Sequence, residues 1–174
     1  FATMAADWKK VVDNLPLRFI FMGALFYLIT CIQCAIHSTL SVQEYVHFTD
    51  WVVGHAHLVL FGTFSFWAFA FIYHFLPKIT GNEIFSKTLG EWHFWLSVVA
   101  MVLMDVVLIA AGLIQGSMWK NLSPFIDTVI ASKPYWWVRT LCGCALLVAE
   151  VCFFINVLIP SLIGLTLLLK KNDD

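Results

Sequence analysis

Charged residues are scarce in this chain of 174 residues: Asp, Glu, Lys and Arg make up 12% of it, whereas hydrophobic residues make up 61%. A soluble domain carries about 25% charged residues, so the composition excludes an ordinary soluble fold and indicates a membrane protein. The formal net charge is −1 and no basic patch is present, so nothing in the charge pattern indicates binding to nucleic acid. Internal repeats and low-complexity tracts are also absent.

What the sequence does contain is four long apolar runs. Each approaches or exceeds the roughly 20 residues that an α-helix needs to cross a bilayer. The sequence therefore predicts an all-α integral membrane protein in which residues 1–174 form a single membrane domain. The predicted transmembrane helices cover approximately residues 17–36, 52–76, 92–114 and 136–169. Pro160 is expected to kink the last of them, and residues 120–135 are predicted to form a loop.

The distribution of Lys and Arg predicts the orientation in the membrane. With both termini inside, seven basic residues flank the inner ends of the spans and three flank the outer ends. Because Lys and Arg accumulate on the cytoplasmic side, both termini are predicted to lie inside. The inner residues are Lys9, Lys10, Arg18, Lys78, Lys87, Lys170 and Lys171, and the outer residues are Lys120, Lys133 and Arg139.

Two groups of residues inside the apolar runs could carry chemistry, namely the cysteines and two acids. All five cysteines lie in these runs, including the CxxC pair Cys31 and Cys34, which we interpret as small hydrophobic packing residues. Asp105 and Glu150 are intramembrane acids, which fit either a proton path or a pair with Arg139 or a backbone group.

The most informative stretch is 47–58, where a polar loop leads into the second apolar run. His55 and His57 are two residues apart, so on an α-helix they point roughly 200° away from each other. They are therefore expected to hold separate partners on opposite sides of one helix rather than to share one metal ion. The simplest interpretation is that each imidazole binds a planar cofactor on its own side of the helix, because imidazole is an axial ligand of haem iron. Gly54 would let such a flat group approach the backbone. The alternative is two hydrogen-bonded polar residues inside a bundle.

Neighbouring residues suggest supporting roles. His47 and Trp51 can donate hydrogen bonds to anionic haem propionates, and Asp50 can share a proton or fix a donor there. The alternative for this segment is a helix start capped by Thr49 or Asp50, with Trp51 as an interfacial aromatic residue. Gln33, on the first span, can orient a ligating histidine from behind, although a plain interhelical hydrogen bond explains it equally well.

These residues resemble a known family. His47-Phe48-Thr49-Asp50-Trp51 followed by Gly54-His55-Ala56-His57 is similar to the tenth helix of the catalytic subunit of C-type (cbb3-type) haem–copper oxidases. The resemblance extends over roughly residues 8–160 and implies the last four helices of a twelve-helix subunit I. Supporting similarity lies in Leu17-Arg18-Phe19 with Gly23 and Tyr27, His93-Phe94-Trp95, residues 112–119, and Pro134-Tyr135-Trp136-Trp137 with Arg139.

The resemblance implies a role for each matching residue. His55 matches the proximal ligand of a high-spin haem b, His57 matches an axial ligand of a low-spin haem b, and His47 and Trp51 match residues near the propionates. Electrons would come from c-type cytochrome subunits, and dioxygen would be reduced to water with protons taken from the inside of an energy-transducing inner membrane. The copper of the binuclear site and the remaining haem ligand would be held by a partner chain or the missing part of the subunit.

Two departures from the family pattern leave alternatives open. Gln33 stands where the family usually has Glu. Residues 58–62 are more similar to those of nitric oxide reductases, so part of the large subunit of such an enzyme is a second interpretation. A third is a di-haem b-type electron-transfer anchor, in which His37, His74 and His93 would have to supply the partners of His55 and His57. A fourth is an assembly protein without haem.

Overall fold

The computed structural model describes residues 2–172, and within helix α8 it leaves the side chains of residues 165 and 167–172 undescribed. All regular elements in the described part of the chain are helical. In chain order they are α1 (Ala2–Ala6), α2 (Trp8–Asp13), α3 (Leu15–His37), α4 (Leu40–Val46), α5 (Asp50–His57), the π-helix η1 (Leu58–Ser65), α6 (Phe66–Thr80), α7 (Lys87–Lys120) and α8 (Phe125–Asn172).

Four helical rods are long and apolar enough to cross a membrane, which confirms the predicted all-α fold with four membrane helices. They are Leu15–His37, Asp50–Thr80, Lys87–Lys120 and Phe125–Gly164. Each is longer than the sequence suggested. In particular, residues 125–135 were expected to be a loop but are helical, and α8 continues through both Pro134 and Pro160.

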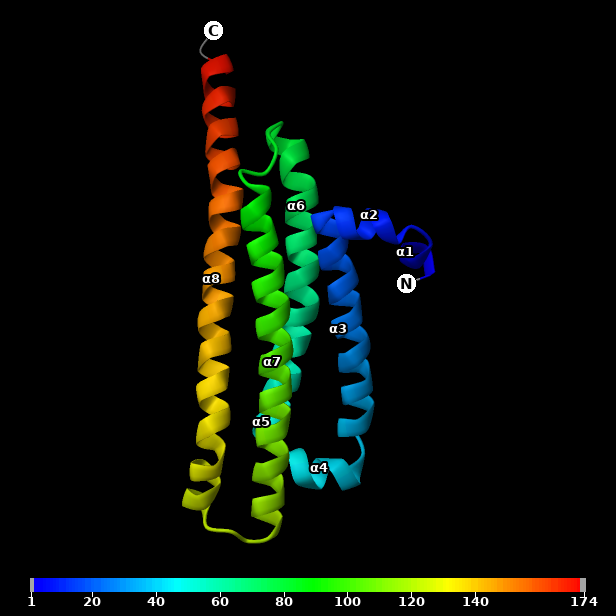
Figure 1. Cartoon of the computed structure of the whole chain (residues 1–174), viewed down its shortest axis with the longest axis vertical. Coiled ribbons are helices and arrows are strands. Elements are labelled where there is room, and N and C mark those ends of the chain that lie inside the picture. Colours follow the sequence, from blue (N-terminus) through cyan, green and yellow to red (C-terminus); the bar gives the residue numbers. More distant parts are fainter. Residues whose placement is uncertain (1, 173–174) are drawn as a thin grey trace.

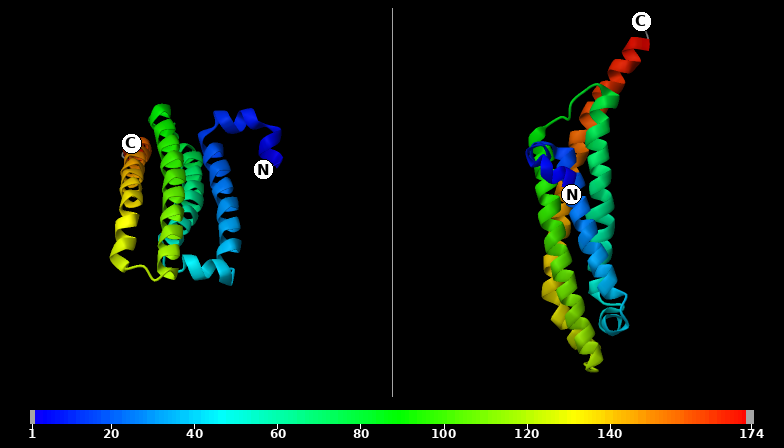
Figure 2. Two further views of the ribbon diagram at one scale, coloured as in Figure 1. Left: turned by 60° about the horizontal axis from the view of Figure 1, so that its bottom comes forward. Right: turned by 90° about the vertical axis from the view of Figure 1, so that its right-hand side faces the viewer.

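The four rods lie side by side in the membrane domain (Figure 1). Helix α7 packs against α8 on one side and against α5 on the other, while α3 packs against η1 and α6. The short α4 and the α7–α8 connection lie at one end, and α2 and the α6–α7 loop lie towards the other (Figure 2). The side chains of Lys170 and Lys171, which contributed to the predicted orientation, lie outside the described part of α8.

Two glycines on α7 bring α4 and α5 into close contact with it. A Cβ atom on Gly112 would overlap the backbone nitrogen of Trp51, and one on Gly116 would overlap the carbonyl oxygen of Tyr45. Small residues at this spacing allow helix backbones to approach in membranes. The start of the histidine-bearing helix is therefore positioned by backbone-to-backbone packing on α7.

Gly54 also serves helix packing, and here the sequence-based interpretation was wrong. A Cβ on Gly54 would lie 2.9 Å from the Cβ of Leu108 on α7. The close neighbour at this glycine is thus another helix and not a flat cofactor.

The second rod changes its helical form directly after His57. Residues 58–65 form a π-helix, with the hydroxyl of Thr63 donating to the Leu58 carbonyl at 3.4 Å and that of Ser65 donating to the Leu60 carbonyl at 3.2 Å. Each of these side chains thus bonds to a carbonyl five residues earlier. π-Helical turns are rare and concentrate at functional sites. The wider turn changes the direction of every side chain after His57 relative to a regular α-helix.

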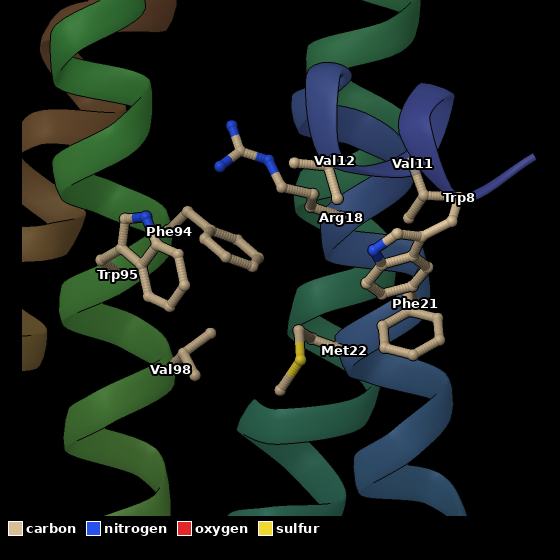
Figure 3. A pocket seen from close by; sticks show the side chains of 9 residues that line it. All are labelled: Trp8, Val11, Val12, Arg18, Phe21, Met22, Phe94, Trp95 and Val98. Carbon is tan, nitrogen blue, oxygen red and sulfur yellow. The ribbon is translucent and has the colours of Figure 1, made fainter. Parts of the chain in front are cut away.

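An apolar cavity of about 230 Å³ lies between α2, α3 and α7 (Figure 3). Arg18 borders it and forms an ion pair with Glu91 of α7, in which Nη1 donates to Oε2 at 2.7 Å. Of the lining residues on α3, Met22 is the nearest to Gln33 in sequence. The two residues are separated by roughly 16 Å along the helix axis. The cavity is therefore remote from the candidate ligands.

Candidate haem-ligand site

The ring of His55 is held from behind by a chain of hydrogen bonds. Its Nδ1 lies 3.0 Å from Oε1 of Gln33, and Nε2 of Gln33 donates to Oδ2 of Asp105 at 3.1 Å. Because the amide nitrogen is turned to a carboxylate, the amide oxygen faces the histidine and can only accept. Nδ1 of His55 therefore carries the proton, and the lone pair of the neutral ring is on Nε2.

The ring of His57 is held in the same protonation form by its own helix. Its Nδ1 lies 2.7 Å from the backbone carbonyl oxygen of Val53. A carbonyl oxygen only accepts, so Nδ1 is again the donor and Nε2 again has the free lone pair. Both side chains are half-buried.

The two rings thus present equivalent nitrogens in different directions. His55 contacts Gln33 of α3, whereas His57 contacts a backbone carbonyl of its own helix α5. On an α-helix, side chains two residues apart point in directions that differ by roughly 200°. Among the described residues no group of three or more His, Cys, Asp or Glu side chains is arranged to hold a metal ion. Within the described residues, neither histidine therefore belongs to a cluster that could hold a metal ion by itself.

Trp51 and His37 line the side of the His55 ring. The Trp51 ring is stacked on His55 with centroids 5.7 Å apart, and His37 meets Trp51 edge-on at 4.7 Å. The His37 ring is also 6.1 Å from that of His55. Trp51 is buried, so it is a packing residue of this cluster. The sequence did not indicate the contact of His37, because it depends on how the end of α3 meets α5.

Asp50 is engaged by two other helices. Its Oδ2 accepts from Nε2 of Gln115 at 2.7 Å and from the indole nitrogen of Trp136 at 2.6 Å, and its backbone nitrogen donates to Oε1 of Gln115 at 2.8 Å. Thr49 caps the same helix by accepting from the Trp51 nitrogen at 3.3 Å. Asp50 therefore joins the start of α5 to α7 and α8. The sequence did not identify Gln115 and Trp136 as its partners.

His47 lies apart from this network, at the end of α4. It is exposed, its Nδ1 is 2.9 Å from Nε2 of Gln43, and its ring contacts Phe48. Since an exposed imidazole is free to donate to an external group, the position remains compatible with the predicted role near a propionate.

The other intramembrane polar residues have different partners from those considered on sequence grounds. Asp105 pairs with Gln33, and Glu150 lies near His93. In the described part of the chain no ion pair joins either acid to Arg139. His93 is fully buried within the bundle.

Known proteins of one family are similar to this chain over most of its length. Residues 1–145 match the family described as Cytochrome C and Quinol oxidase polypeptide I. The chain is 30% identical over 149 residues to a "Cytochrome c oxidase subunit 1 homolog" of Agrobacterium tumefaciens (strain T37), covering 81% of this chain and 28% of that protein. It is 29% identical to the "Cbb3-type cytochrome c oxidase subunit CcoN1" of Stutzerimonas stutzeri, covering 81% of this chain and 31% of that protein.

A further relative is a nitric oxide reductase subunit of Stutzerimonas stutzeri, which is 24% identical over 67% of this chain and 27% of its own length. The chain thus spans less than a third of the length of each of these three curated relatives. The four apolar rods and the family match together identify a multi-pass membrane protein. This chain belongs to the cytochrome c and quinol oxidase polypeptide I family, whose members are subunits of haem-containing respiratory oxidases.

Proposed function

We propose that this chain forms the C-terminal, haem-ligating part of the catalytic subunit of a cbb3-type cytochrome c oxidase. His55 is the proximal ligand of the high-spin haem b, and His57 is an axial ligand of the low-spin haem b. The complete enzyme takes electrons from c-type cytochrome subunits and reduces dioxygen to water in an energy-transducing inner membrane.

A single observation carries this proposal: both imidazoles are fixed through Nδ1 and leave Nε2 free. A ligating histidine usually donates its other ring nitrogen to a carboxylate, a carbonyl or water, which fixes the tautomer and raises the basicity of the ligand. Gln33 and the Val53 carbonyl supply those acceptors here. The residues present therefore fit an imidazole-bound porphyrin on each side of α5. When bound, haem iron supplies electron transfer at one position and dioxygen binding at the other.

The role of the remaining residues follows from their contacts. Asp50 holds α5 against α7 and α8 and so sets the depth of both histidines, while Trp51 supports the plane of the His55 ring. His47, at the exposed end, is the donor available to a propionate. The copper ligands and the second ligand of the low-spin haem must come from the remaining part of the subunit, because the described residues hold no further ligand cluster.

Single substitutions in the assembled complex test the ligand assignment. We expect His55→Ala to remove the high-spin haem absorption and abolish turnover, while His57→Ala mainly removes the low-spin absorption. His74→Ala is the matched control, because His74 is exposed and lies beside Lys78 rather than in the site. Normal haem spectra in both the His55 and His57 variants would show that the ligand assignment is wrong.

The second candidate is the corresponding part of a nitric oxide reductase. The similarity to a subunit of such an enzyme and the residues 58–62 after the histidine pair favour it. Metal analysis of the purified complex separates the two functions. Copper together with two b haems supports the oxidase, whereas non-haem iron with two b haems supports the reductase.

The di-haem anchor is disfavoured by the geometry. His93 is sealed in the core, and His74 is 2.7 Å from the amine of Lys78. His37 lies beside His55, so among the described residues His57 has no second histidine.

A further inference from the structure

Three polar side chains from three different helices, two of them buried and one half-buried, form a cluster. Tyr73 comes from α6, His93 from α7 and Glu150 from α8. His93 is fully buried and Tyr73 is 3% exposed. An intramembrane ionisable residue needs a partner and generally marks a functional path. This cluster is separate from the candidate haem ligands, because Asp105, which supports His55, follows His93 by roughly 18 Å along α7.

The two facing atoms in this cluster lack hydrogen-bond partners. Nδ1 of His93 is 3.0 Å from the Tyr73 hydroxyl, but its Nε2 is 3.9 Å from Oε1 of Glu150, and neither of these last two atoms has a hydrogen-bond partner among the described residues. A separation of 3.9 Å is too long for a direct hydrogen bond. Leaving a buried polar atom unsatisfied is energetically costly, and a small group bridging the two atoms would satisfy both.

Aromatic rings seal the other sides of the imidazole. The rings of Phe19, Phe69 and Phe153 have centroids 4.9, 4.6 and 5.0 Å from that of His93. Glu150, by contrast, keeps 25% of its side chain exposed on α8. The imidazole is therefore enclosed, whereas part of the Glu150 side chain reaches the surface of α8.

We propose that Glu150 and His93 form a binding site for one water molecule and one exchangeable proton, with Tyr73 orienting the imidazole. A water molecule beside the gap, about 2.8 Å from each atom, reaches both Nε2 and Oε1. Buried waters of this kind satisfy polar groups that the protein leaves unpaired. Ser97 lies one turn further on the same face of α7, and its buried hydroxyl also has no partner among the described side chains.

The proton has two positions in this site. When His93 donates through Nδ1–H to the Tyr73 oxygen, the lone pair on Nε2 faces the water. A proton then leaves the carboxyl group of Glu150 for the water, which passes one of its own protons to Nε2. The products are a carboxylate and an imidazolium, so the net charge of the site is unchanged.

The exposed side of Glu150 supplies the route for exchange with the outside of the cluster. Since the aromatic wall closes the histidine end, the proton enters and leaves through the carboxyl group. The site thus holds a proton within the membrane domain independently of any haem, and it goes beyond the function proposed above.

Infrared spectroscopy of the purified complex tests this proposal. We expect Glu150→Gln to remove a carboxylic-acid carbonyl band, and the same wild-type band to shift in D2O because its proton exchanges. Tyr73→Phe and His93→Gln should both shift the Glu150 band, since each changes how the imidazole shares the proton. Glu44→Gln is the matched control, because Glu44 is an exposed carboxylate near Lys120 and should leave the carboxylic-acid region unchanged.

The outcomes are distinct. A Glu150 band whose frequency is the same in the wild type, Tyr73→Phe and His93→Gln would overturn the shared-proton site. A band that does not shift in D2O would do the same. The tyrosine variant retains the aromatic ring, so the test stands even where the histidine variant fails to assemble. Because the readout is the carboxyl group and not a haem spectrum, failure here is distinguishable from failure of the oxidase assignment.

Discussion

Gln33 orients His55 across the interface between α3 and α5: its amide oxygen lies 3.0 Å from Nδ1 of the imidazole while its amide nitrogen donates to Asp105. The amide is uncharged, yet it performs both tasks because it combines an acceptor and a donor in one group. A glutamate at this position would accept from the histidine but would place a second carboxyl group beside Asp105.

The first prediction concerns this amide. Gln33→Leu removes the acceptor for Nδ1 of His55, so the ring loses its fixed tautomer, and haem retention at that ligand should weaken by roughly 10–100-fold. Gln33→Glu should preserve the iron–imidazole bond better, because the carboxyl group still accepts from Nδ1. Resonance Raman spectra of the iron–histidine stretch, together with haem loss to a competing globin, measure both variants. Equal behaviour of the Leu variant and the wild type would refute a positioning role.

The second prediction concerns the packing of α5 on α7. Gly112→Ala places a methyl group against the Trp51 backbone, and the helices must separate. Overpacking of this kind costs about 1–3 kcal/mol, and we expect a clear loss of thermal stability together with weakened binding of both haems. The control is Gly143→Ala, because a Cβ at Gly143 meets nothing within 4 Å. An unchanged unfolding midpoint for the Gly112 variant would contradict the close approach.

The third prediction concerns Asp50. Asp50→Ala removes the common acceptor of the Trp136 indole and the Gln115 amide. Both hydrogen bonds are part-buried and the Gln115 amide still donates to Ser132, so we expect a loss of about 1–3 kcal/mol in all. Asp50→Asn retains one acceptor oxygen and should cost less. The readout is the unfolding midpoint in detergent, with Asp127→Ala, an exposed acid in the first turn of α8, as the comparison. If Asp50 acted only on a propionate, the Ala variant would retain its stability without haem.

The fourth prediction concerns orientation. With the termini inside, a cysteine at Asn82 in the α6–α7 loop should react with an impermeant maleimide only after the membrane is permeabilised. A cysteine at Leu122, between α7 and α8, should react from the outside directly. Labelling in the opposite order would reverse the orientation that the Lys and Arg count predicts.

The fold could be predicted from the sequence because its determinants are local. Four long apolar runs dictate four spanning helices, since backbone groups in a bilayer must be satisfied within each segment. Helix ends were less predictable: residues 125–135 contain Pro134 and polar residues, yet they continue α8 because that segment packs on α7 through Ser132 and Gln115.

The candidate site was predictable only in part. The spacing of His55 and His57 implies divergent directions from helix geometry alone, and Gln33 was singled out as a group that can orient a histidine. The acceptor for His57, the backbone carbonyl of Val53, carries no sequence signal because every residue has a carbonyl. The π-helix after His57 was also missed, because its residues resemble an ordinary apolar run.

By itself, the sequence determined that this protein lies in a membrane, that it has four spanning helices, and that two imidazoles leave one of them in different directions. These properties follow from composition and from the period of the helix. Only the tertiary structure decided which nitrogen of each ring is free, that Gly54 packs on Leu108, and that His93 faces Glu150 at a distance of 3.9 Å. Apart from the Val53 carbonyl, which fixes His57 within its own helix, those relationships join residues far apart in the chain, and their distances depend on how closely the helices pack.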